Sequence, residues 1–177
     1  MGTFWFITGG ARSGKSSFAE KLAISWGNEV VFLATAEGID DDMMTRIARH
    51  QQSRPSEWTT VEEPVDIVSA GSRSPQSSTL VIDCLTVWVG NLFHRRVAQP
   101  DIEVMARDLV TFVANRAGRT IVVSNDVGLG VHPETELGRK YRDCLGRVNS
   151  IVASESEHCV FMSAGKAMML QDVEYLL

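Results

Sequence analysis

Apolar and polar positions divide the chain into two alternating kinds of segment. Short, continuously apolar runs are typical of strands that are buried on both faces. They cover Thr3–Thr8, Glu29–Ala34, Leu80–Asp83, Thr120–Ser124 and, as the last strand, Cys159–Met162. Longer segments with apolar residues at helical spacing cover Ser16–Trp26, Asp40–Arg54, Val104–Ala117 and Glu134–Glu157. This alternation predicts an α/β fold, with a mainly parallel central sheet and helices on both of its faces.

Length and loop composition predict one domain over residues 1–177. A chain of 177 residues is a natural size for a single domain with its own core. The one stretch with loop-like composition, Gly71–Ser78, is too short to link two domains, and the sequence contains no internal repeat.

Charge, hydropathy and cysteine usage exclude several classes of function. The 17 Lys and Arg against 22 Asp and Glu give a formal net charge of −5, which argues against nonspecific binding of nucleic acid. No apolar stretch approaches the roughly 18 residues that cross a bilayer, and the first residues do not resemble a signal peptide. The three cysteines are widely spaced and lack zinc-ligand spacing, which is typical of free thiols in a reducing compartment. We therefore predict a cytoplasmic protein without a membrane span.

A glycine-rich loop follows the first predicted strand and fits the pattern G-x-x-x-x-G-K-[ST]. It consists of Gly9, Gly10, Ala11, Arg12, Ser13, Gly14, Lys15 and Ser16. Its glycines let consecutive backbone N–H groups surround phosphate oxygens, and Lys15 adds a positive charge at the β- and γ-phosphates. Ser16 supplies a hydroxyl to Mg²⁺, and the helix that begins here directs its positive end toward the same anion. The motif predicts a P-loop NTPase-like site for a nucleoside triphosphate such as ATP or GTP.

A second metal ligand is expected at the carboxyl end of another buried strand. Asp83 ends the run Leu80–Asp83, and ligands of open α/β sheets gather at that edge. Asp126 follows the next strand and reaches the same edge, so either carboxylate could help to place Mg²⁺. We prefer Asp83, together with Ser16, while a helix-capping role for Asp83 stays open.

The predicted helix over Asp40–Arg54 carries a stripe of possible chemical function. Arg46, His50 and Arg54 are spaced i, i+4, i+8 and so share one helix face. Guanidinium groups on both sides would depress the pKa of the imidazole and keep it neutral at pH 7. A neutral imidazole beside a phosphate clamp is suited to attack the α-phosphorus of a nucleotide. From these residues alone, an ordinary solvated helix with a surface histidine is the favoured interpretation.

Motifs along nearly the whole chain resemble the bifunctional adenosylcobinamide kinase / adenosylcobinamide-phosphate guanylyltransferase family of cobalamin biosynthesis. They are the loop Gly9–Ser16, Ala34-Thr35-Ala36, Arg46-Ile47 with His50, Arg54-Pro55 with Trp58, Thr60 and Glu62, Asp83-Cys84-Leu85-Thr86, Ser124-Asn125-Asp126-Val127-Gly128 with Gly130, and Arg142-Asp143 with Gly146, Arg147 and Asn149.

The resemblance implies two reactions and a set of site residues. Adenosylcobinamide is phosphorylated with ATP or GTP, and GMP is then transferred from GTP to adenosylcobinamide phosphate, giving adenosyl-GDP-cobinamide. His50 matches the histidine that carries GMP covalently, with Lys15 as the other catalytic residue. The implied nucleotide contacts beyond the loop are Ala34, Thr35, Ala36, Gln51, Gln52, Ser53, Arg54, Glu62 and Asp83. The resemblance also implies a homo-oligomer, specifically a trimer.

Two other functions stay open at this point. One is a simpler small-molecule kinase, in which His50 is inert and the helix with Arg139 and Arg142 acts as a lid. The other is a nucleotide-dependent switch or ATPase without a small-molecule acceptor. The basic residues of that helix, which also include Lys140 and Arg147, either form a solvated face or bind a phosphate or the corrinoid side chain. His132 is a further candidate for a substrate contact.

Overall fold

The computed structural model describes residues 2–37 and 54–176 of the chain. Within these residues the strands are β1 (Phe4–Gly9), β2 (Val30–Ala34), β3 (Thr59–Glu62), β4 (Thr79–Asp83), β5 (Thr120–Val123), β6 (His158–Ser163) and β7 (Lys166–Leu170). The helices are α1 (Lys15–Ser25), α3 (Ile67–Ser72), α4 (Leu85–His94), α5 (Gln99–Ala114), α6 (Glu136–Ser154) and the 3₁₀ turn η1 (Val173–Leu176).

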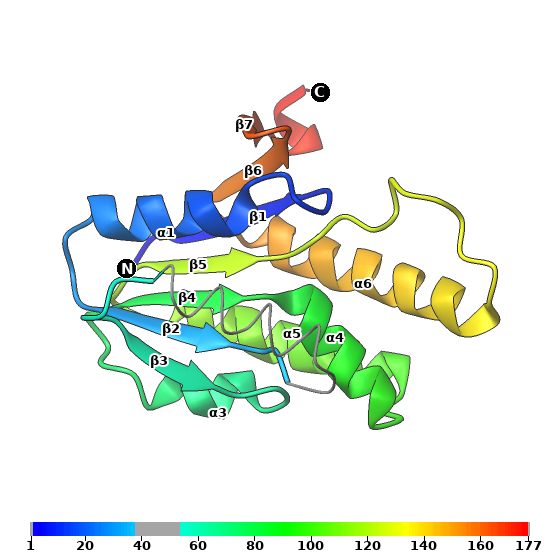
Figure 1. Ribbon diagram of the computed structural model, residues 1–177, viewed down its shortest axis with the longest axis horizontal. Coiled ribbons are helices and arrows are strands. Elements are labelled where there is room, and N and C mark those ends of the chain that lie inside the picture. The colour runs from blue at the N-terminus through cyan, green and yellow to red at the C-terminus, as the bar shows by residue number, and fades with distance from the viewer. Residues whose placement is uncertain (1, 38–53, 177) are drawn as a thin grey trace.

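One seven-stranded sheet, ordered β3-β2-β4-β5-β1-β6-β7, runs through the described part of the chain. Its strand pairs are parallel except for β6 and β7, which form an antiparallel hairpin. The register aligns the strand ends, since Ala34 lies opposite both Glu62 and Asp83, and Asp83 lies opposite Val123. The carboxyl ends of the parallel strands therefore meet at one edge, which is at the right of Figure 1.

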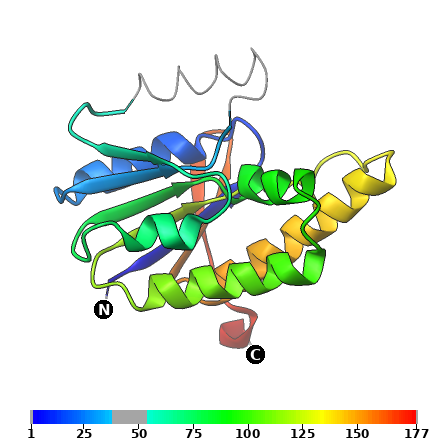
Figure 2. The ribbon, with the colours of Figure 1, turned by 90° about the horizontal axis from the view of Figure 1, so that it is seen from below.

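Helices cover both faces of this sheet, as Figures 1 and 2 show. Alternate strand residues point to opposite sides: Phe6 and Leu80 pack with α3, α4, α5 and α6, whereas Ile7 and Val81 pack with α1. Because both sets are buried, the central strands need apolar residues at every position. This explains why they appear in the sequence as uninterrupted apolar runs.

The predicted fold class is confirmed, and the central strands lie within one or two residues of their predicted bounds. The prediction missed β3, α3 and β7, and the expectation that Cys159–Met162 is the last strand is wrong. Residues of β3 and β7 are mostly exposed at the two borders of the sheet, so they lack the apolar signal of a central strand. Nearly all of the predicted helix Asp40–Arg54 lies outside the described residues. No helix within the described ranges is long and apolar enough to span a membrane.

Candidate nucleotide-binding site

The phosphate loop connects β1 to α1 at the carboxyl edge of the sheet (Figure 1). Its turns require glycine at both ends: Gly9 has a φ of 139° and Gly14, which precedes α1, has a φ of 98°. A side chain on Gly9 would overlap the carbonyl oxygen of Met162 on the neighbouring β6. The loop therefore has the backbone path that its motif predicts, with the amino end of α1 directed toward it.

Lys15 is buried and folds back over the loop. Its ammonium group donates hydrogen bonds to the carbonyl oxygen of Gly10 at 2.5 Å and to the Ser13 hydroxyl at 3.3 Å. Burial lowers the pKa of Lys15, while the nearby Cys84 thiol and the Asp83 carboxylate act in the opposite direction. A buried ammonium with an anionic neighbour is well placed to exchange its loop partners for phosphate oxygens.

Ser16 and Asp83, the two predicted ligands of a divalent cation, lie on α1 and β4. Ser16 lies in the first turn of α1, and Asp83 ends β4 and interacts electrostatically with Lys15, the neighbour of Ser16. Residues 2–37 and 54–176 contain no cluster of three or more His, Cys, Asp and Glu side chains that could hold a metal. A hydroxyl and a carboxylate fit Mg²⁺, which prefers oxygen ligands and usually takes others from water and phosphate.

Thr35 follows β2 at the carboxyl edge of the sheet, and its polar groups form hydrogen bonds within the fold. Thr35 is fully buried, and its hydroxyl donates to the carbonyl oxygen of Cys84 at 2.8 Å and accepts from the Cys84 N–H at 2.9 Å. The side-chain amide of Asn91 donates to the Thr35 carbonyl oxygen at 2.8 Å. Thr35 therefore ties the end of β2 to the turn after β4. The nucleotide contacts predicted for Ala34, Thr35 and Ala36 stay a prediction.

Arg54 lies on the sheet close to the predicted metal ligand. Its guanidinium carbon is 3.7 Å from the centroid of the Phe32 ring, and Phe32 stacks on Trp58 with centroids 6.2 Å apart. Burial lowers the pKa of Arg54, while the carboxylates of Asp83, Glu20 and Glu62 act in the opposite direction. The structure thus brings Arg54, Glu62, Asp83 and Lys15 into one electrostatic neighbourhood.

Several predicted site residues lie outside the described part of the chain. They are His50, Gln51, Gln52 and Ser53, which directly precede Arg54. Two nitrogens of the Arg54 guanidinium group, Nε and Nη1, are enclosed and lack a hydrogen-bond partner among the described residues.

A polar network at the end of β5 was missed in the sequence. Ser124 donates from its hydroxyl to Asn149 Oδ1 at 2.6 Å, and Asn149 Nδ2 donates to the Asn125 carbonyl oxygen at 3.0 Å. Thr86 Oγ1 accepts from the Asn125 N–H at 2.7 Å, and the Tyr141 hydroxyl donates to the Thr86 carbonyl oxygen at 2.9 Å. The network joins β5 to α4 and α6, so it holds the backbone that continues from β5 toward the phosphate loop.

The basic residues of α6 have intramolecular partners. Arg147 pairs with Glu103 at 3.2 Å, Arg142 with Asp143 at 2.8 Å, and Lys140 with Glu136 at 2.7 Å. Arg139 donates to the carbonyl oxygens of Pro133 and Glu134. These contacts account for the four side chains structurally, and their binding of a phosphate or corrinoid group stays a prediction.

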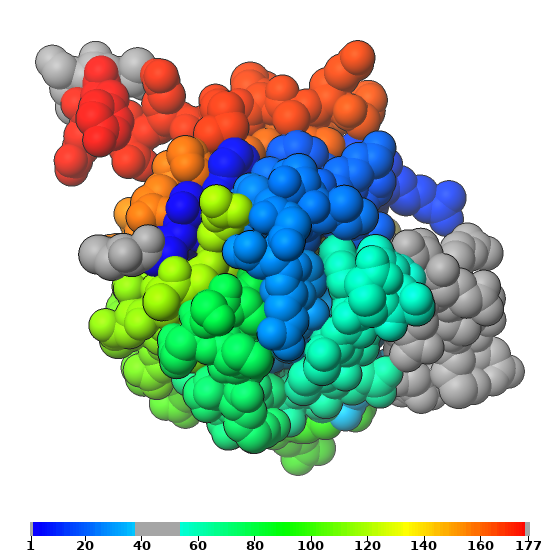
Figure 3. Space-filling model, turned by 90° about the vertical axis from the view of Figure 1, so that its left-hand side faces the viewer, coloured from blue at the N-terminus to red at the C-terminus, as the bar shows by residue number. Residues whose placement is uncertain are grey.

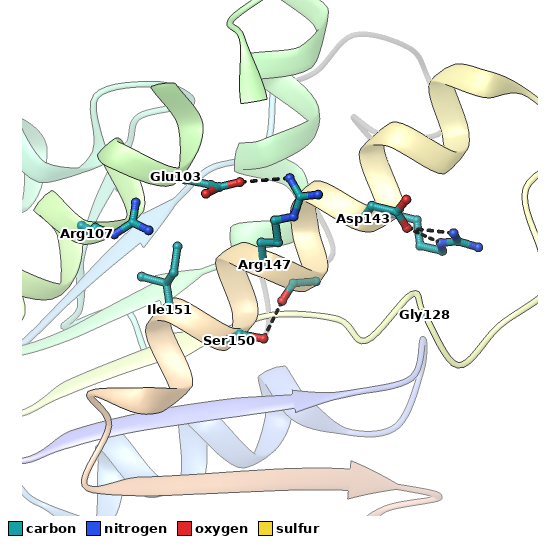
Figure 4. A pocket seen from close by; sticks show the side chains of 9 residues that line it. Glu103, Arg107, Gly128, Asp143, Arg147, Ser150 and Ile151 are labelled. Carbon is teal, nitrogen blue, oxygen red and sulfur yellow. Dashed lines mark hydrogen bonds and ion pairs between the residues drawn. The ribbon is translucent and has the colours of Figure 1, made fainter. Parts of the chain in front are cut away.

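A groove of about 730 Å³ lies beside α5 and α6 (Figure 4). Its lining includes Arg107, Arg142, Arg147 and Gly128.

His132 contacts Arg142, with Nδ1 2.8 Å from a guanidinium nitrogen. Arginine can only donate, so this nitrogen of His132 accepts the hydrogen bond. In the structure His132 therefore contacts α6, and its contact with substrate stays a prediction.

The sheet and the loop together define the class of protein as one with a P-loop NTPase-like α/β fold. The fold is similar to the crystal structure of the RadB recombinase, with a TM-score of 0.51 and 12% sequence identity over 90% of this chain and 73% of that chain. At this identity the likeness concerns the fold alone.

The family is identified by sequence comparison. The family model described as cobinamide kinase / cobinamide phosphate guanyltransferase matches residues 5–170, and the chain belongs to this family. It is 40% identical to the bifunctional adenosylcobalamin biosynthesis protein CobP of Pseudomonas aeruginosa, over 93% of this chain and 95% of that protein. It is 32% identical to the protein of the same description, CobU, of Escherichia coli, over 90% and 94% of the two chains. The resemblance inferred from the motifs is confirmed.

Proposed function

We propose that this enzyme carries out both reactions of its family at one phosphate-binding site, with His50 as the carrier of GMP. The chain is a kinase and guanylyltransferase of cobalamin biosynthesis. The observation that supports a shared site is the placement of Lys15 in the loop, within electrostatic reach of Asp83 and with Arg54 near the same carboxylate.

In the first reaction, a hydroxyl oxygen of adenosylcobinamide attacks the γ-phosphorus of ATP or GTP. The loop amides and Lys15 hold the β- and γ-phosphates and stabilise the negative charge that develops on the leaving diphosphate. The present hydrogen-bond partners of Lys15, Gly10 and Ser13, belong to the loop itself. The ammonium group therefore already lies at the loop that is proposed to hold the phosphates. The protein therefore contributes position and charge to this step.

Mg²⁺ is proposed as the metal of the site, held by Ser16 and Asp83. When bound with the nucleotide, it neutralises charge on the phosphates. Ser16 and Asp83 contribute a hydroxyl and a carboxylate from two adjoining elements, α1 and β4. This assignment predicts that both reactions require the divalent cation.

In the second reaction, the neutral imidazole of His50 attacks the α-phosphorus of GTP. The bond from the α-phosphorus to the bridging oxygen breaks, and pyrophosphate leaves with the electron pair. A phosphate oxygen of adenosylcobinamide phosphate then attacks the phosphorus of the His50–GMP adduct and releases the imidazole. The observation that supports this role is that Arg54, four residues after His50 in the sequence, lies over Phe32 near Asp83.

The test is His50→Ala, assayed for both activities. We expect the adduct from GTP labelled at the α-phosphate to disappear, and transfer of GMP to slow by at least about 4 kcal/mol in barrier, or roughly a thousandfold. Phosphorylation of adenosylcobinamide should persist, because that step needs no covalent intermediate. His94→Ala is the matched control, since His94 is exposed at the end of α4.

Three outcomes would refute this role. A folded His50→Ala variant that still transfers GMP at a comparable rate would show that His50 is not the carrier. A variant that is folded by circular dichroism but loses both activities together would show that His50 has a general role in the site. A wild-type enzyme that phosphorylates the corrinoid but forms no adduct would indicate the plain kinase.

The enzyme is further proposed to act as a trimer in the cytoplasm. Cys84, Cys144 and Cys159 are free thiols, which suits a reducing compartment. Exposed apolar residues on β7 and the following turn, Met168, Met169, Val173 and Tyr175, support a subunit contact there, where the hairpin projects at one border in Figure 3. Light scattering on the purified protein tests this state, and a monomer at micromolar concentration would refute it.

A further inference from the structure

Asp126 lies at the centre of the edge where the phosphate loop and the metal ligand meet. The sheet order β4-β5-β1 places β5 between the strand that ends in Asp83 and the strand that leads to the loop. Asp126 follows β5, and its backbone N–H donates to the carbonyl oxygen of Gly9 at 3.0 Å. Asp126 therefore lies at the same edge of the sheet as the phosphate loop and Asp83, where ligands of open α/β sheets bind.

The carboxylate of Asp126 is oriented but not neutralised by a cation. Its Oδ1 accepts a hydrogen bond from the Gly128 N–H at 3.2 Å, which orients the side chain. Within residues 2–37 and 54–176, Asp126 has no ion pair, unlike Asp143 and Glu103, which pair with arginines of α6. The residue is partly exposed at the edge, and its other carboxylate oxygen has no hydrogen bond to the described residues.

Neighbouring polar residues cannot take the same role. Ser124 is buried, and its hydroxyl donates to Asn149 in the network at the end of β5. Asn125 uses its backbone N–H and carbonyl in that network, and its side-chain amide is not basic. Asp83 is assigned to the metal. Asp126 is therefore the carboxylate next to the phosphate loop that is positioned to accept a proton.

We infer that Asp126 is the general base of the kinase reaction; this inference rests on the proposed function. The acceptor is an alcohol, whose oxygen forms a bond to the γ-phosphorus. The bond between that phosphorus and the β–γ bridging oxygen breaks, and the nucleoside diphosphate leaves with the electron pair. The proton of the alcohol moves to the free oxygen of Asp126, which later releases it to water.

The test uses Asp126→Asn, because asparagine keeps an oxygen that can accept from the Gly128 N–H and loses only the basic group. We expect kcat for phosphorylation of adenosylcobinamide by ATP to fall about 10²- to 10⁴-fold, with KM for ATP within about threefold of wild type. Formation of the adduct from labelled GTP should stay near the wild-type rate, because the neutral imidazole of His50 needs no base. Asp126→Glu should recover much of the kinase rate. Asp108→Asn, an exposed carboxylate of α5, is the matched control.

Formation of the adduct also reports that the Asp126→Asn variant is folded. If that variant does not fold, Asp126→Ser is compared with wild type in the same two assays, and the same expectations apply. A kinase rate within about tenfold of wild type would overturn the assignment, because it would show that the carboxylate is not needed as a base. Loss of adduct formation together with kinase activity, restored by raised Mg²⁺, would overturn it in favour of a metal ligand. If the wild-type enzyme itself failed to phosphorylate adenosylcobinamide, the proposed function would fail before the role of Asp126 was tested.

Discussion

Lys15→Met separates the stability of the fold from the function of the phosphate loop. The Lys15 side chain is 7% exposed, so folding removes a charged ammonium group from water. Its hydrogen bonds to Gly10 and Ser13 return only part of that cost, and burial accordingly lowers the pKa of the lysine. Methionine has a similar length and no charge. We expect the variant to be much less active than wild type and yet at least as stable without nucleotide.

The burial and the position of Lys15 indicate the size of the gain in stability and of the loss of activity. Replacing buried charged groups with apolar groups of similar volume is often neutral or stabilising, and the stabilising cases begin at about 1 kcal/mol. For a chain of 177 residues this corresponds to a rise in Tm of about 2–4 °C. Loss of one preorganised donor to the reacting phosphates should cost about 3–4 kcal/mol in the transition state, or roughly 10²- to 10³-fold in kcat. Both reactions should lose this amount if they share the loop.

The difference in stability between Lys15→Met and wild type should depend on pH, because the pKa of Lys15 is lowered in the folded state. Below the lowered folded-state pKa, Lys15 is protonated in both the folded and the unfolded state, so the whole cost of burying its charge is present. As the pH rises through the folded-state pKa toward the unfolded value of 10.5, the folded state loses the proton first and the cost disappears. The Tm of Lys15→Met should therefore exceed that of wild type most below the folded-state pKa of Lys15, and the two Tm values should converge as the pH rises toward 10.5.

The assay is thermal unfolding of both proteins by circular dichroism, at neutral and alkaline pH, with and without GTP and Mg²⁺. Nucleotide should raise the Tm of wild type by mass action and leave that of the variant nearly unchanged. A variant that is clearly less stable than wild type at pH 7 would refute the argument about the buried charge. A variant that keeps either activity near the wild-type rate would refute the shared phosphate site.

Three further predictions concern other parts of the site. Gly9→Ala should lower the free energy of unfolding in urea by about 2–4 kcal/mol, because the new side chain would overlap the Met162 carbonyl oxygen and φ is 139°. Cys84 should react with iodoacetamide at pH 8 about a thousandfold more slowly in the native than in the unfolded protein. The reason is that the pKa of the thiol is raised to about 12, mainly by burial, so that less of the reactive thiolate is present. Asn149→Ala should cost about 1–3 kcal/mol in urea unfolding, because it leaves the buried Ser124 hydroxyl without its acceptor.

Each of these has a result that would contradict it. Gly10→Ala is the control for Gly9, because a side chain there would meet no atom within 4 Å, and equal effects of the two changes would count against the clash. Rapid alkylation of native Cys84 would show that its thiol is not held in the protonated form. Ser150→Ala is the control for Asn149→Ala, since Ser150 is exposed on the same helix. Equally small losses of stability in both variants would show that the hydrogen bond from Ser124 to Asn149 does not stabilise the fold.

Local sequence patterns determined the fold class and the phosphate loop. The run Thr3–Thr8 predicted β1 within a residue, because a strand covered on both faces must be apolar throughout. The place of the loop Gly9–Ser16 between a strand and a helix could be predicted, since its glycines and Lys15 are contiguous in the chain, while its nucleotide contacts stay a prediction. Family membership could be inferred in the same way, because its motifs are short and keep their order. The role of His50, which lies outside the described residues, continues to rest on this kind of signal.

Tertiary structure alone decided which distant residues share the site. β3 and β7 escaped prediction because border strands can be exposed and then lack an apolar pattern. The position of Asp126 between Asp83 and Gly9 depends on the strand order β4-β5-β1, which is set by pairing between segments far apart in the chain. The bond from Ser124 to Asn149 depends equally on how α6 packs on the sheet. Periodicity reports whether a residue is buried, but it carries no information about which residue it is buried against.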